Sequence, residues 1–87
     1  MNYRVFWSPH AEKRLENLTQ DSASAAELAA AARQIDQALA TDPIGFGESR
    51  YDTVRIAFLR PLGVQYDVLE DVRTVIVDAV WRIDVRG

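Results

Sequence analysis

Arginines in the second half of the sequence are the residues best suited to chemistry. Arg55 and Arg82 lie within two stretches rich in apolar residues, and Arg60 closely follows the first of them. A guanidinium group forms paired hydrogen bonds to phosphate or carboxylate, and it can stabilise the charge that develops on a scissile phosphate. Arg55, Arg82 and Arg60 are therefore the candidate catalytic residues.

Asp67 and Asp78 offer a simpler use for the same arginines. If the apolar stretches pair as strands, Arg55 and Arg82 can form opposite-charge pairs with these two acids. Such exposed pairs contribute about 0–1 kcal/mol each. We favour this structural interpretation, because one sheet face would then carry two acids for its two arginines.

Other reactive residues are scarce. The only histidine, His10, lies in the first turn of an expected helix, so we expect it to be exposed rather than a general base. The sequence contains no cysteine, which excludes a disulfide framework and a thiolate zinc site. We therefore expect neither a metal nor a cofactor.

The pattern of apolar residues predicts an α+β fold with the order β-α-α-β-β-β, in which a two-helix hairpin packs on a small antiparallel sheet. Ser8 and Pro9 favour a helix start, and Asp42 before Pro43 ends the second helix. Period-2 alternation marks the last three strands. The stretch 44–52, which contains two glycines, is expected to be a loop, and 60–63 a turn. The elements of this single domain, 1–87, are expected at 3–7, 9–19, 24–40, 53–59, 64–69 and 74–83.

The same alternation predicts two different sheet faces. One face is continuously apolar and should pack on the helices. Tyr66 and Trp81 fall on it, so we expect them to pack in the core rather than to form a platform for stacked bases. The predicted core face consists of Val54, Ile56, Phe58, Val64, Tyr66, Val68, Val75, Val77, Ala79 and Trp81, and the opposite face mixes apolar residues with Arg55, Gln65, Asp67, Asp78 and Arg82.

The mixed face also carries more apolar residues than solvent exposure favours, which predicts a protein-binding surface. The loop before the second strand adds two exposed candidates, because binding residues often lie on loops. The alanine-rich stripe of the second helix is expected to pack inside the domain. The predicted partner-binding residues are Leu59, Leu69, Ile76, Val80, Arg50 and Tyr51.

The charge balance argues against a nucleic-acid binder. The net charge is −3, and neither half of the sequence has an excess of basic residues. Proteins that bind nucleic acid usually carry a basic patch, since neutralising phosphates releases counterions. Residues 1–20 lack the pattern of a signal peptide and no stretch is long and apolar enough to span a membrane, so we expect a cytoplasmic protein that does not act at a membrane.

The sequence resembles the RelE/ParE superfamily of type II toxins. YRVFWSPHAEKRLENL is similar to the family's opening strand and helix, and DPIGFGESRYDTVRI is similar to its helix end and second strand. PLGVQYDVLEDVRTVIVDAVWRI is similar to its closing hairpin. The resemblance implies one of two activities. RelE-like members cut mRNA on the ribosome with basic residues on the open sheet face, and ParE-like members act on DNA gyrase. It also implies an antitoxin that wraps the toxin.

Position by position, the sequence departs from the nuclease pattern. Arg55 matches a basic position of the second strand in the nucleases. The next position on that face, which is usually basic in the nucleases, is Ala57 in this sequence, and Gly63 stands where an arginine is expected. Arg82 can stand for the arginine that contacts phosphate. The last tyrosine is Tyr66, so we expect the C-terminal tyrosine of the nucleases to be missing.

Our leading hypothesis is a toxin of a toxin–antitoxin system, of the kind associated with plasmid stabilisation, that is neutralised by a cognate antitoxin and is ParE-like. The alternatives are a ribosome-dependent mRNA endoribonuclease and a non-toxic interaction domain with the same fold. The expected partners are the antitoxin, with DNA gyrase or the ribosome as target, and a homodimer is left open.

Overall fold

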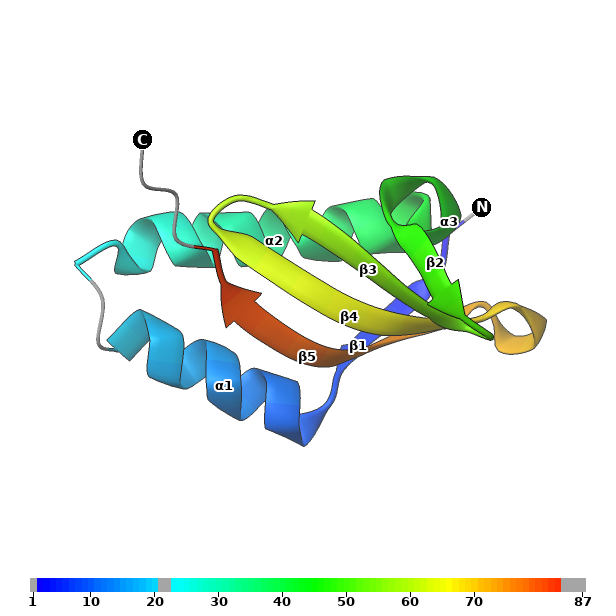
Figure 1. Ribbon diagram of the computed structural model, residues 1–87, viewed down its shortest axis with the longest axis horizontal. Helices are drawn as coiled ribbons and strands as arrows, with labels where there is room; N and C mark the ends of the chain where they lie inside the picture. Colours follow the sequence, from blue (N-terminus) through cyan, green and yellow to red (C-terminus); the bar gives the residue numbers. More distant parts are fainter. Residues whose placement is uncertain (1, 21–22, 84–87) are drawn as a thin grey trace.

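A computed structural model describes residues 2–20 and 23–83, which form one sheet with helices on one side (Figure 1). Its sheet is five-stranded, in the order β1-β5-β4-β3-β2. The elements are β1 (Arg4–Trp7), α1 (Pro9–Gln20), α2 (Ala25–Thr41), α3 (Pro43–Phe46), β2 (Glu48–Tyr51), β3 (Val54–Leu59), β4 (Leu62–Leu69), the 3₁₀ turn η1 (Glu70–Val72) and β5 (Thr74–Arg82).

The predicted α+β fold class and order of elements are confirmed, with two additions. First, β1 pairs in parallel with β5, so the sheet is mixed rather than wholly antiparallel. Second, the stretch 44–52 is not a loop, because it contributes to α3 and forms the edge strand β2. All four residues of β2 are exposed, which leaves no alternation of apolar and polar residues for a sequence pattern to reveal.

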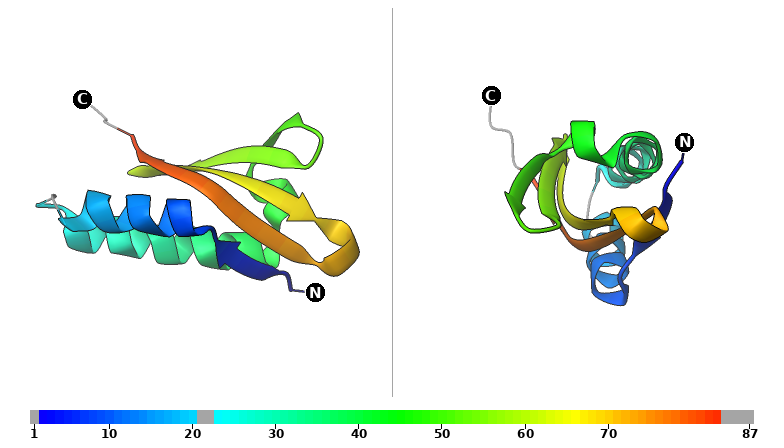
Figure 2. Two further views of the ribbon diagram at one scale, coloured as in Figure 1. Left: turned by 90° about the horizontal axis from the view of Figure 1, so that it is seen from below. Right: turned by 90° about the vertical axis from the view of Figure 1, so that its right-hand side faces the viewer.

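Helices α1 and α2 pack side by side and cover one face of the sheet (Figure 2). Apolar residues at helical spacing in α2, among them Leu28, Ile35 and Leu39, have no exposed surface, as the predicted stripe requires. Side chains of the two central strands meet them from the sheet. The fully buried residues of this layer are Ala11, Leu28, Ile35, Leu39, Leu62, Val64, Tyr66, Val75 and Val77.

The predicted faces of β3 are reversed. Leu59 pairs with Leu62 across a two-residue turn, so odd-numbered residues of β3 share a face with even-numbered residues of β4. Because the even-numbered residues of β4 are buried against the helices, Arg55 and Ala57 also lie on the helix side. Ala57 is 2% exposed and Phe58 56% exposed, the reverse of the faces that the alternation predicted.

A β-bulge reverses the predicted faces in the second half of β5. The pairing with β4 shifts by one residue between Gln65 and Tyr66, which leaves Asp78 as an extra residue. Since side chains alternate with a period of two, one extra residue moves all later side chains to the other face. Val80 is consequently 3% exposed and Trp81 lies on the side away from the helices, so both predictions were wrong.

Candidate functional site

The sheet face turned away from α1 and α2, here called the open face, is the main candidate site. No helix of the described part of the chain covers it (Figure 2). Two of its aromatic side chains, Phe6 and Phe58, are 53% and 56% exposed. From the strand register, the open face consists of Arg4, Phe6, Glu48, Tyr51, Val54, Ile56, Phe58, Gly63, Gln65, Asp67, Leu69, Thr74, Ile76, Ala79 and Trp81, with Asp78 at the bulge.

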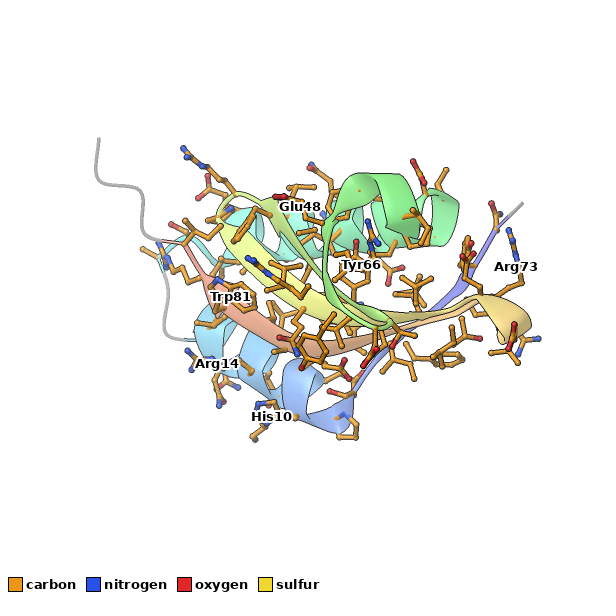
Figure 3. All side chains as sticks on the ribbon, turned by 45° about the vertical axis from the view of Figure 1, so that its right-hand side comes forward. His10, Arg14, Glu48, Tyr66, Arg73 and Trp81 are labelled. Atoms are coloured by element: carbon orange, nitrogen blue, oxygen red, sulfur yellow. The ribbon has the colours of Figure 1, made fainter. Side chains whose placement is uncertain are left out.

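An aromatic patch occupies one end of the open face. Trp81 lies opposite Gly63, and a Cβ atom on Gly63 would come within 2.6–2.8 Å of the indole ring. The indole therefore lies directly over the backbone of β4. Phe58, the partner of Gly63 on β3, meets Trp81 edge to face with 6.2 Å between ring centroids. The position of Trp81 near the end of β5 is visible in Figure 3.

A pair of carboxyl groups lies in the middle of the open face. Asp67 accepts a hydrogen bond from the Thr53 hydroxyl at 2.7 Å and another from Asp78. These hydrogen bonds lower the pKa of Asp67, with Asp78 the larger cause. Burial raises the pKa of Asp78 to about 7, and the neighbouring Asp67 acts in the same direction. At pH 7 Asp78 is therefore protonated in about half of the molecules, while Asp67 is ionised.

We expect stability to fall from pH 5 to pH 8. The folded state binds the Asp78 proton more tightly than the unfolded chain, so this contribution is full below about pH 4 and is lost as the pH rises through 7. Because Asp78 is partly exposed, solvent screening limits the change to about 1 kcal/mol. Asp78→Asn, which can still donate to Asp67, should remove this decline. Thermal melts of both proteins at pH 5 and 8 test this expectation, and equal declines would contradict it.

Arg55 does not reach the open face. It lies opposite Tyr66 on the helix side, where its Nη2 donates to the carbonyls of Ile44 at 2.8 Å and Gly47 at 3.0 Å. The Tyr66 hydroxyl donates to the Pro43 carbonyl at 2.7 Å. Figure 3 shows Tyr66 beside α3. Arg55 and Tyr66 thus hold residues 43–47 against the sheet, an arrangement we call the α3 clamp.

The other predicted catalytic arginines also lie off the open face. Arg82 pairs with Leu62, on the helix side at the end of the sheet, and is exposed. Arg60 is exposed in the turn between β3 and β4. The predicted pairing of arginines with Asp67 and Asp78 is wrong for Arg55, since its contacts lie on the opposite face.

The structure separates the predicted partner-binding residues into two groups. Leu59 and Val80 were assigned to the open face, but Leu59 packs against the core and Val80 belongs to it. Leu69 and Ile76 do lie on the open face, each partly exposed. Tyr51, 65% exposed, lies on the edge strand β2 with the exposed Arg50 rather than in a loop.

A groove between α1 and α2 is a second concave surface. Its volume is about 1000 Å³, and Ala29 and Ala32 from the alanine-rich helix line it together with Leu15. Trp7 also lines the groove and donates from Nε1 to Asp36 at 3.1 Å. The two tryptophans of the sequence therefore lie on two different surfaces, Trp7 in the groove and Trp81 on the open face.

His10 is exposed on α1, as predicted. Within residues 2–20 and 23–83, no group of three histidine, aspartate or glutamate residues is arranged to hold a metal ion. None of the described helices is long and apolar enough to cross a membrane.

Comparison with solved structures establishes the fold. No family model and no curated protein matches the sequence. A chain of the toxin–antitoxin complex RelBE2 from Mycobacterium tuberculosis superimposes with a TM-score of 0.79 at 19% identity, covering 94% of this chain and 92% of that one. The isolated E. coli RelE toxin gives 0.67 at 18% identity over 98% and 88% of the two chains. A chain of the ParDE system of P. aeruginosa gives 0.69 at 15% identity over 94% and 97%. The fold is that of RelE/ParE toxins.

Proposed function

We propose that this chain, which has the RelE/ParE toxin fold, is the toxin of a toxin–antitoxin system and acts on a protein target. A cognate antitoxin neutralises it by covering the open face. The observation that carries the proposal is the chemistry of that face, which is apolar and aromatic with a central carboxyl pair. A contiguous apolar surface of this kind marks a binding site for another protein.

The comparisons support an antitoxin partner. The structures from M. tuberculosis and E. coli include complexes of a toxin with its antitoxin, and the E. coli RelBE complex matches 97% of this chain with a TM-score of 0.65. A partner of that kind would remove Phe6 and Phe58 from water. Burial of apolar surface contributes about 25 cal/mol per Å², so these two side chains alone favour association.

The position of the arginines supports a ParE-like protein target over mRNA cleavage. A phosphate approaching the open face would meet Asp67 and Asp78 at its centre, while Arg55 is engaged in the α3 clamp. Cleavage of a phosphodiester needs cations where charge develops. A net charge of −3 further disfavours entry into the phosphate-rich ribosome. DNA gyrase, the target that the ParE resemblance implies, is the first protein to test.

The growth test uses this protein with the product of the neighbouring short reading frame. Expression of the chain alone should arrest growth, and co-expression of the neighbour should restore it and yield a stable complex. Purified DNA gyrase should lose supercoiling activity on addition of the chain. Unaffected growth together with no complex would overturn the toxin proposal. Normal growth with a stable complex would indicate a non-toxic interaction domain.

The two tryptophans test which surface the antitoxin covers. In Trp7→Phe the remaining Trp81 reports on the open face, and in Trp81→Phe the remaining Trp7 reports on the helix groove. We expect the antitoxin to shift Trp81 emission to the blue, because the partly exposed indole loses contact with water, and to leave Trp7 emission unchanged. A shift of Trp7 alone would place the antitoxin in the groove.

One observation favours the endoribonuclease as a second candidate. Trp81 lies on the open face over Gly63, where a nucleobase can stack on the indole. Arg60 and Arg82 lie at the same end of the sheet and can contact phosphate. Primer extension on translated mRNA tests this candidate. Cleavage that disappears in Trp81→Ala and in the double variant Arg60→Ala, Arg82→Ala would favour it over a protein target, and absence of cleavage by the unmodified chain would exclude it.

A further inference from the structure

The carboxyl pair of the open face lies between two apolar groups. Phe6 and Ile76 are neighbours on β1 and β5 at one end, and the Trp81 patch lies at the other. Asp67 lies opposite Ile76 on the neighbouring strand β4, and Asp78 lies two residues after Ile76 on β5. A segment laid along β5 would therefore meet apolar, acidic and apolar surface in turn.

The charge at the centre of this surface is uncompensated by any described cation. Apart from burial, the pKa of Asp67 is shifted by Asp78 and Thr53. Apart from burial, the pKa of Asp78 is shifted by Asp67 alone. Beside the pair, β3 presents Val54 and Ile56 to the open face, neither of which titrates. On the same face, Arg4 lies beside Thr74, one row beyond Phe6 and Ile76, and Glu48 and Tyr51 lie on the edge strand β2 beside Ile56 and Val54.

We propose that the protein segment covering the open face places one lysine or arginine side chain between Asp67 and Asp78, with apolar side chains on both sides of it. The proposal rests on the proposed function, because it describes the antitoxin segment that binds there. Charge complementarity is the argument, since covering an ionised carboxyl pair without a counter-charge would bury uncompensated charge. A cation with apolar neighbours matches this face in both charge and order.

The cation would take the place of a proton. At pH 7 the pair holds about half a proton on average, because burial raises the pKa of Asp78 to about 7 and Asp67 is ionised. A bound guanidinium or ammonium group favours the doubly ionised pair, so binding at pH 7 releases up to about half a proton. The free carboxyls then bind the cation more tightly as Asp78 ionises. Affinity should therefore increase between pH 6 and pH 8, by up to about tenfold.

Titration calorimetry tests the proposal with the product of the neighbouring short reading frame as the probe. Measurements at pH 7 in two buffers of different ionisation enthalpy give the number of protons released. We expect release of about half a proton, which is roughly the fraction of Asp78 protonated at this pH. In Asp78→Asn, the release should vanish and the affinity should fall at least about tenfold, the size of one charged hydrogen-bonded contact.

Glu27→Gln is the matched control, because Glu27 is an exposed acid in the first turn of α2, on the other side of the sheet from the open face. It should bind with unchanged affinity and unchanged proton release. Thermal melts of each variant show that it is folded. If Asp78→Asn binds as tightly as the unmodified chain, or if no proton is released, the cation proposal is overturned while the antitoxin proposal stands. If no complex forms with any of the proteins, both proposals fail.

Discussion

Gly47→Ala is expected to lower the free energy of unfolding by about 2–3 kcal/mol, the cost of forcing extra volume into a packed site. A Cβ atom on Gly47 would lie 2.4 Å from the Tyr66 hydroxyl and 2.7 Å from the Ile56 carbonyl oxygen. Neither neighbour can easily move, since Tyr66 is fully buried and the carbonyl belongs to β3. Urea denaturation of both proteins measures the difference.

Tyr66→Phe separates the two clashes. It removes the hydroxyl that the new methyl group would meet, although it also removes the hydrogen bond to the Pro43 carbonyl. In a double-mutant cycle, Gly47→Ala should therefore cost less in the Tyr66→Phe background than in the unmodified protein. An equal cost in both backgrounds would show that the clash with the Ile56 carbonyl alone sets the penalty. A cost below about 0.5 kcal/mol in both would contradict the packing described for the α3 clamp.

Arg55→Ala is expected to destabilise the protein by about 1–3 kcal/mol, because hydrogen bonds from a charged donor contribute in that range. The variant loses the Nη2 contacts to the Ile44 and Gly47 carbonyls. The loss is partly offset because the buried Arg55 Nε, which has no hydrogen-bond partner, is also removed. Urea denaturation measures this change, with binding of the antitoxin measured separately on the folded variant.

Arg50→Ala is the matched control for Arg55→Ala. Arg50 is exposed on the edge strand β2, a few residues from the α3 clamp, and its removal should change stability by less than about 0.5 kcal/mol. If Arg55 instead acted in catalysis, Arg55→Ala would abolish activity and leave stability unchanged. That result would contradict the structural role assigned to Arg55 here.

Together these expectations change the role of the arginine that the sequence first singled out. Arg55 is the best match to a nuclease position, yet it serves the packing of residues 43–47. The open face consequently offers carboxyls where a nuclease would offer cations. This difference is the physical reason for proposing a protein target rather than mRNA cleavage.

Local patterns of apolar residues in the sequence determined which segments form helices and strands. The apolar spacing of Leu28, Ile35 and Leu39 specifies a helix with one buried stripe, and these residues are buried as predicted. The burial of Tyr66 also follows from its place among Val64 and Val68 in an alternating strand. Such periodicities depend only on neighbouring residues, so the order of helices and the main strands could be derived from sequence.

Pairing between strands decided which face each side chain occupies. The two-residue turn sets Leu59 opposite Leu62, and the bulge at Asp78 shifts the rest of β5 by one residue. Either effect transfers a whole set of side chains to the other face, because the alternation has a period of two. The length of the turn could have predicted the faces of β3 from the sequence. When an even number of residues connects two antiparallel strands, odd-numbered residues of one strand share a face with even-numbered residues of the other, which puts Arg55 on the face of Tyr66.

The bulge had no comparable signal, because nothing in the residues around Asp78 marks an insertion before its partner strand is known. The sequence alone therefore determined a helix-covered sheet and the residues available to line it. Only the tertiary structure decided that Trp81 and Phe58 face outwards and that Arg55 faces inwards, away from the two aspartates that the sequence had already assigned to the open face. Register is a property of paired strands, and a single strand does not contain it.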